Sequence, residues 1–167
     1  GHSERRIFFS ESNQMIRDKV AAAIRNGLSP VLCVGETAME KADGQARQIL
    51  HEQLVTALSN LTSEDMEKVV VAYEPVWAIA SFGGKHSLPE ENQKMIKFIR
   101  QQVADLYGDK IAKRLRVLYG GTVDNNNAAS YLRIEGCNGF IVGSASLNHH
   151  KFSGIVEAAY RSNREKK

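Results

Sequence analysis

The sequence predicts an α/β protein with a parallel sheet, built as part of a (β/α)8 barrel. Short apolar runs rich in β-branched residues alternate along the chain with longer stretches in which apolar residues recur every three or four positions. The short runs are nearly continuously apolar, which is typical of parallel strands that are buried on both faces. A complete barrel takes about 250 residues, or roughly 30 per strand-helix unit. The 167 residues therefore correspond to about five units.

The first half of the chain is expected to form a helix followed by two strand-helix units. The opening helix is expected at residues 12–25, where apolar side chains such as Ile16 and Val20 share one face. The apolar run PVLCVG predicts a strand at residues 30–35, and the helical period of Leu50, Leu54 and Leu61 predicts a helix over 46–61. A second strand is expected at residues 69–76, in the run VVVAYEPV.

The second half continues the same alternation with a long helix and two further units. The helix at residues 89–107 has the clearest start, because Pro89 suits a first helical turn and Ser87 with Glu90 predicts a capping box. Two more strands follow, each before a shorter helix: the strands are expected at 115–119 and 138–142, and the helices at 126–133 and 151–161.

We therefore expect a partial barrel of about four strands and five helices. Residues 1–167 would form the carboxy-terminal part of a single domain. The chain does not begin with Met, and we expect the first strand and about three further units to lie upstream.

Composition excludes several classes of protein. Hydrophobic residues make up 43% and charged residues 25%, as in average globular domains, which excludes a disordered, collagenous or coiled-coil chain. No apolar stretch is long enough to cross a membrane, and no basic stripe with interleaved aromatic residues indicates nucleic-acid binding. Cys33 and Cys137 match neither a disulfide framework nor a metal-ligand spacing, so we expect buried thiols, a cytoplasmic protein and no metal site.

Glu74 is the first candidate for chemistry, because active sites of parallel barrels lie just after the carboxyl ends of the strands. A carboxylate inside the run from Val69 to Trp77 is costly to bury in its charged form, so its pKa is expected to rise toward that of a useful base. A structural ion pair at the end of a strand would explain the same residue.

Two glycine-rich turns are the second indication of a functional site. The segments 120–122 and 143–144 each follow an expected strand and precede a short helix, so their backbone amides could converge on one anion. A single turn of this kind is more often only a tight connection, but two in successive final units favour a phosphate site.

At these motifs the chain resembles the triosephosphate isomerase family over nearly its whole length. The resemblance lies in five motifs, GHSERR at 1–6, CVGET at 33–37, AYEPVWAI at 72–79, YGGTV at 119–123 and GFIVGSASL at 139–147. It implies a TIM barrel and an isomerase that interconverts dihydroxyacetone phosphate and glyceraldehyde 3-phosphate through an enediolate in glycolysis and gluconeogenesis, without cofactor or metal.

The resemblance also implies roles for individual residues. His2 would be the neutral imidazole electrophile and Glu74 the general base, supported by Ser3 and Glu4. Glu36 and Arg5 would be structural. The substrate phosphate would be bound by Thr122, Gly143 and Ser144, and by an amide of the lid that follows Trp77; that amide belongs to either Ala80 or Gly83.

The chain departs from the family pattern in ways that keep alternatives open. Its lid is about two residues longer, and the amino-terminal Asn-x-Lys motif of the family does not occur in the sequence. We expect a homodimer when full length and an inactive chain in isolation. A non-catalytic phosphate-binding or scaffolding relative, or another phosphate-handling barrel enzyme, are the alternatives.

Overall fold

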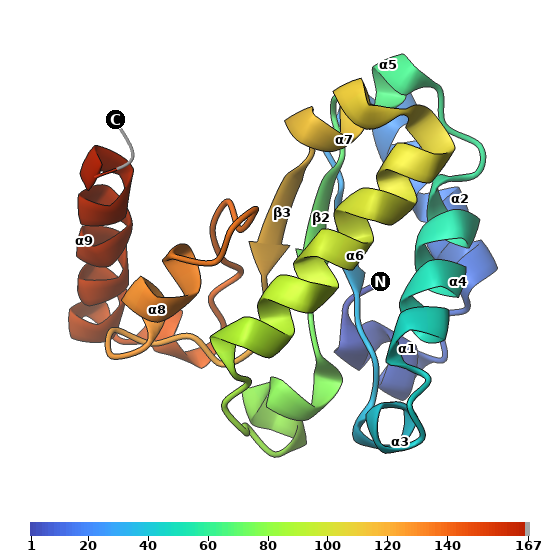
Figure 1. Ribbon diagram of the computed structural model, residues 1–167. Helices are drawn as coiled ribbons and strands as arrows, with labels where there is room; N and C mark the ends of the chain where they lie inside the picture. Colours follow the sequence, from blue (N-terminus) through green and yellow to red (C-terminus); the bar gives the residue numbers. More distant parts are fainter. Residues whose placement is uncertain (166–167) are drawn as a thin grey trace.

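Three parallel strands form the sheet in the computed structural model, which describes residues 1–165 (Figure 1). The strands β1 (Val31–Val34), β2 (Val70–Tyr73) and β3 (Arg116–Tyr119) lie in the order β1-β2-β3. Their register pairs Cys33 with Ala72 and Ala72 with Leu118. The α/β class with a parallel sheet is confirmed, and the open sheet is consistent with part of a barrel. The last two residues of the predicted range 1–167 lie outside the described residues.

Nine α-helices surround the strands within residues 1–165. Their bounds are α1 Ser3–Phe9, α2 Asn13–Arg25, α3 Ala38–Ala42, α4 Ala46–Leu58, α5 Ser63–Met66, α6 Pro89–Tyr107, α7 Asp109–Arg114, α8 Ala128–Leu132 and α9 His149–Glu165. Three 3-10 turns accompany them: η1 Val76–Ala78, η2 Ala80–Phe82 and η3 Ser144–Leu147. Helix α4 packs against both α2 and α6, while α8 and α9 pack together on the β3 side of the sheet (Figure 1).

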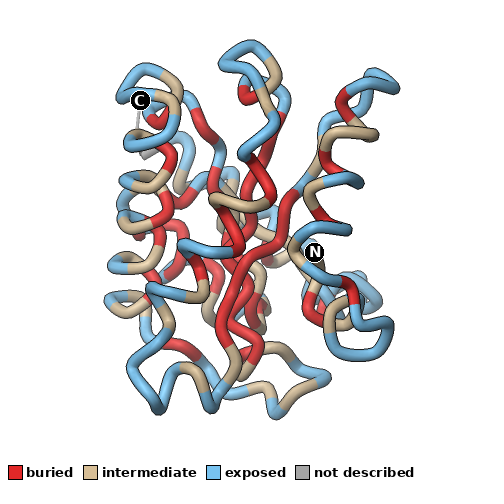
Figure 2. Tube along the Cα trace, turned by 90° about the vertical axis from the view of Figure 1, so that its right-hand side faces the viewer, coloured by how far each residue is buried: buried red, intermediate tan, exposed pale blue. Residues whose placement is uncertain are grey.

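The core lies between the sheet and its helices. Alternate strand residues such as Leu32, Val71 and Val117 join the apolar faces of α2, α4 and α6, and all are almost completely buried. Figure 2 shows these buried segments running along the strands through the middle of the molecule. Cys33 and Cys137 are also buried. No helix among the described residues is long and apolar enough to cross a bilayer.

The predicted fourth strand is reduced to a single bridge, between Tyr119 and Phe140. The backbone of 138–142 does run along β3, with Tyr119 N–H donating to the Gly139 carbonyl and Ile141 N–H donating to the Tyr119 carbonyl, both at 2.9 Å. However, the Val117 amide donates to the Asn138 side-chain oxygen, and Gly139 has a φ of 151°, so a regular ladder does not form.

The expected five helices become nine because short helices form in the connections. Helices α3 and α5 each begin with a capping box, Thr37 with Glu40 and Thr62 with Asp65. The capping box expected at α6 is wrong. Leu88 is the N-cap there without a side-chain hydrogen bond, and the buried Ser87 hydroxyl donates to Asn92 Oδ1 at 2.5 Å.

Candidate active site

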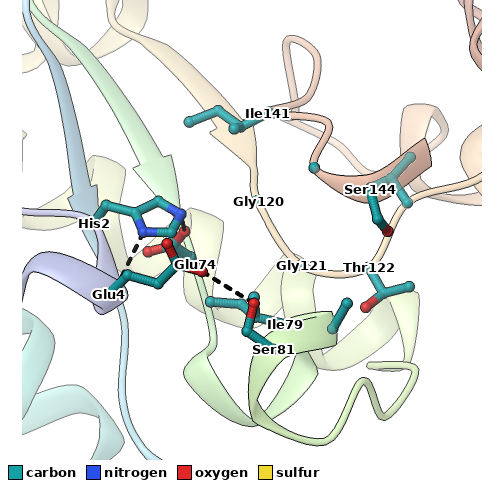
Figure 3. Close-up of a pocket in the computed structure, with 13 residues that line it drawn as sticks. His2, Glu4, Glu74, Ile79, Ser81, Gly120, Gly121, Thr122, Ile141 and Ser144 are labelled. Atoms are coloured by element: carbon teal, nitrogen blue, oxygen red, sulfur yellow. Dashed lines mark hydrogen bonds and ion pairs between the residues drawn. The ribbon is translucent and has the colours of Figure 1, made fainter. Parts of the chain in front are cut away.

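A pocket of about 290 Å³ lies at the carboxyl ends of the strands (Figure 3). It is lined by the start of the chain, by the segments after β2 and β3, and by the segment that leads into η3 with the first residue of η3. The lining residues are His2, Glu4, Glu74, Ile79, Ala80, Ser81, Gly120, Gly121, Thr122, Val123, Ile141, Gly143 and Ser144. The pocket therefore gathers both residues expected to be catalytic and four of the five expected to bind phosphate.

His2 is held at the start of α1, where it is the N-cap residue. Its Nδ1 accepts a hydrogen bond from the Glu4 amide at 3.2 Å, so this nitrogen carries a lone pair and the ring proton resides on Nε2. Nε2 lies 2.7 Å from Glu74 Oε1. The imidazole is thus a neutral hydrogen-bond donor aimed at the carboxylate.

Glu74 follows β2 directly and is 3% exposed. Its backbone amide extends the sheet by donating to the Val34 carbonyl at 2.7 Å, which brings the side chain to the pocket. The second carboxylate oxygen, Oε2, accepts the Ser3 amide at 2.8 Å. Burial raises the pKa of Glu74, and the hydrogen bond from the Ser3 amide offsets part of that rise. A buried carboxylate with a raised pKa is suited to take and return a proton.

The turn after β3 forms the floor of the pocket. The Gly120 amide donates to the Tyr73 carbonyl at 2.8 Å, and a Cβ at Gly120 would lie 3.5 Å from that of Glu74. Thr122 lines the pocket, but its amide and its hydroxyl both donate to the Ala78 carbonyl, at 2.8 and 2.7 Å. Thr122 therefore ties the turn to the segment after β2, and it would need to exchange these bonds to contact an anion.

Ser144 lies across the pocket from His2 (Figure 3), and the preceding residue, Gly143, also lines the pocket. A Cβ at Gly143 would meet no atom within 4 Å, so the backbone here faces open space. Gly143 is the N-cap of η3 and Ser144 is its first residue, and the first amides of a helix have no partner within the helix. This wall can therefore offer backbone donors to a ligand in the pocket.

The segment after η1 supplies the remaining wall. Ile79, Ala80 and Ser81 line the pocket, whereas Gly83 closes η2 with a φ of 116° and is not among the lining residues. Sequence reasoning missed Ile79 and Ser81; their position after a strand was the signal that could have found them.

Glu36 and Arg5 lie outside the pocket lining. Glu36 is 1% exposed and accepts hydrogen bonds from Trp77 Nε1 at 2.8 Å and from the Tyr73 hydroxyl at 3.2 Å. Arg5 Nε donates to Glu11 Oε1 at 2.8 Å. Among the described residues, no group of three or more His, Cys, Asp and Glu side chains is placed to hold a metal ion.

A buried carboxylate, an imidazole and glycine-rich turns at the carboxyl ends of parallel strands are consistent with the active site of a (β/α)8 barrel. The family model described as triosephosphate isomerase matches residues 1–159. The chain belongs to the triosephosphate isomerase family.

Curated relatives support this assignment. The chain is 46% identical over 159 residues to the triosephosphate isomerase of Chlorobaculum tepidum, covering 95% of this chain and 63% of that protein. It is 43% identical over 156 residues to the triosephosphate isomerase of Clostridium tetani, covering 93% of this chain and 60% of that protein. The chain thus spans about three fifths of the length of these relatives.

Proposed function

We propose that the protein containing this chain interconverts dihydroxyacetone phosphate and glyceraldehyde 3-phosphate through an enediolate. The observation that carries the proposal is the 2.7 Å pair of His2 Nε2 and Glu74 Oε1 in a pocket whose opposite wall is a glycine-rich turn. The similarity to the triosephosphate isomerases of Chlorobaculum tepidum and Clostridium tetani supports the same reaction.

The reaction needs one base near two adjacent carbons and one donor facing both oxygens. Glu74 would remove a proton from one carbon of the bound triose phosphate and return it to the other. His2 would donate its Nε2 hydrogen to the developing oxyanion and recover it, since the ring is neutral. In the ligand-free site this hydrogen is directed at Glu74 Oε1, so the substrate oxygen would replace that carboxylate oxygen as its acceptor.

Phosphate binding would fall to the far wall and the lid. Gly143, Ser144 and Thr122 would contact the phosphate, together with the amide of Ala80, which lines the pocket where Gly83 does not. The reactive end of the substrate would then lie against His2 and Glu74, on the other side of the pocket from Ser144 (Figure 3). Exclusion of water by the lid would protect the enediolate from losing its phosphate.

We further propose that the protein acts in the cytoplasm, in glycolysis and gluconeogenesis, and as a homodimer. The 167-residue chain alone is expected to be inactive, because β1 pairs on one side with β2 and has no strand on its other edge within residues 1–165. Assays of this chain, alone and mixed with a separately made amino-terminal segment of a family member, test this. Robust turnover by the chain alone would contradict it.

The direct test is an isomerase assay on the complete gene product, with His2→Ala beside the parent. Turnover is expected in the parent, with a loss of about 10² to 10⁴ in kcat in the variant, the usual contribution of a general acid. Binding of inorganic phosphate without any turnover would instead support a non-catalytic phosphate-binding relative.

A further inference from the structure

Residues 79–88, which connect η1 to α6 and are called the lid below, contact helix α1 at two neighbouring positions. The Ser81 hydroxyl donates to Glu4 Oε1 at 3.0 Å, the contact drawn in Figure 3. The next residue, Phe82, stacks on Phe8 with ring centroids 5.8 Å apart and an interplanar angle of 30°. Most of the lid is exposed, but Phe82 is half-buried.

The two contacts reach the same face of α1, because Glu4 and Phe8 are four residues apart on a helix. This helix also positions the residues of the pocket that are expected to be catalytic. His2 is its N-cap, and the Ser3 amide, in its first turn, holds the Glu74 carboxylate at 2.8 Å. The lid is therefore attached to the element that orients both residues expected to be catalytic.

We propose that Ser81 and Phe82 latch the lid to α1 and so hold Ile79 and Ala80 against the pocket. Ser81, Phe82 and Phe8 are then positioning residues, which act on the reaction through the lid. Their part in catalysis rests on the function proposed above, whereas their effect on lid mobility does not. Between the two contacts, Phe82 is better suited to the latch than Ser81, since a stacked aromatic pair stabilises beyond its area burial.

The latch predicts a measurable increase in lid opening when either ring is removed. Loss of an aromatic pair should raise the population of the open lid about twofold to tenfold. Hydrogen-deuterium exchange read by mass spectrometry on the complete protein reports this directly, through the peptides that cover residues 79–88. Phe8→Ala and Phe82→Ala should each speed exchange of these peptides by that factor and leave those of α2 unchanged.

A double-mutant cycle separates the latch from a general loosening of the structure. If the rings act on each other, the double variant should exchange no faster than either single variant. Phe9→Ala is the matched control, because Phe9 is the next residue of α1, is similarly exposed at 61%, and has its ring under the Arg5 guanidinium at 4.2 Å. Unchanged lid exchange in Phe82→Ala, additive effects in the cycle, or an equal effect of Phe9→Ala would overturn the latch.

A second readout tests the positioning role. Because the latched lid lines the pocket, Phe82→Ala should weaken the binding of inorganic phosphate about twofold to tenfold and raise KM more than it lowers kcat. Faster lid exchange with unchanged or tighter phosphate binding would overturn the positioning role. If the complete protein had no isomerase activity, the hydrogen-exchange cycle would still show whether Phe82 and Phe8 hold the lid. Failure of the proposed function can therefore be told apart from failure of the latch.

Discussion

Replacement of Glu74 by Gln removes the proposed base with the smallest change of shape. Without an ionised carboxylate the side chain cannot take a proton from carbon, so kcat should fall by at least about 10³, within the range of general acid-base catalysis. Glu74→Asp keeps the charge but withdraws it by one methylene, and a misplacement of about 1 Å commonly costs about 10²-fold. The order of activity should therefore be the parent, then Asp, then Gln.

The effect of Glu74→Gln on stability follows from the contacts of the carboxylate. Its two oxygens accept from two donors, the Ser3 amide and His2 Nε2, while a carboxamide offers one oxygen. One donor then loses its acceptor, at a cost of about 1–3 kcal/mol, while relief of the buried charge works in the opposite direction. The variant should therefore remain folded.

The difference in stability between Glu74→Gln and the parent should change with pH in one direction. Burial places the folded-state pKa of Glu74 above its ordinary value of 4.5. The stability that the protonated side chain contributes is thus fully present below pH 4.5 and is lost as the pH rises through the folded-state pKa. Because the Gln side chain does not titrate, the free energy of unfolding of Glu74→Gln should increase relative to that of the parent as the pH rises from 4.5 through the folded-state pKa of Glu74.

Steady-state assays of the complete protein, with circular dichroism melts, measure both effects. Glu135→Gln is the matched control, because Glu135 is an exposed carboxylate paired with Lys97 at 2.8 Å, and its activity should equal that of the parent. A folded Glu74→Gln variant with more than about a tenth of parental turnover would refute the assignment of the base.

The pocket and the two ion pairs of Glu11 give two further predictions. Gly143→Val should weaken inhibition by inorganic phosphate far more than it lowers the melting temperature. The added side chain would enter open pocket space, since no atom lies within 4 Å of its Cβ. Inhibition equal to that of the parent would show that Gly143 is not part of the site. Glu11 accepts hydrogen bonds from Lys19 and Arg5, which lower its pKa to about 2, so its stabilising contribution is present above pH 4.5 and is lost as the pH falls through about 2. Glu11→Gln should therefore be less stable than the parent at pH 7 by denaturant unfolding, and the difference should vanish toward pH 2; a difference independent of pH would show that the ion pairs contribute nothing.

Elements that depend on a local pattern of residues can be predicted from the sequence. Three apolar runs form β1, β2 and β3, and the helical period of residues 89–107 forms α6 over the expected range. A carboxylate inside a strand run and two glycine-rich turns also indicated the pocket before any contact was known. These features depend on residues that are near one another in the sequence. The spacing of apolar residues and glycines is therefore enough to predict them.

Contacts between segments that are distant in the sequence depend on the folded arrangement. The carboxylate at Glu74 meets the Ser3 amide across 71 positions, and Ser81 meets Glu4 across 77. The fourth strand failed because an Asn138 side chain took the amide that a ladder would have used, and the α6 capping box failed because Ser87 turned toward Asn92. In each case the hydrogen bond that forms depends on which donors and acceptors lie close together in the folded chain. A local sequence pattern carries no information about those neighbours.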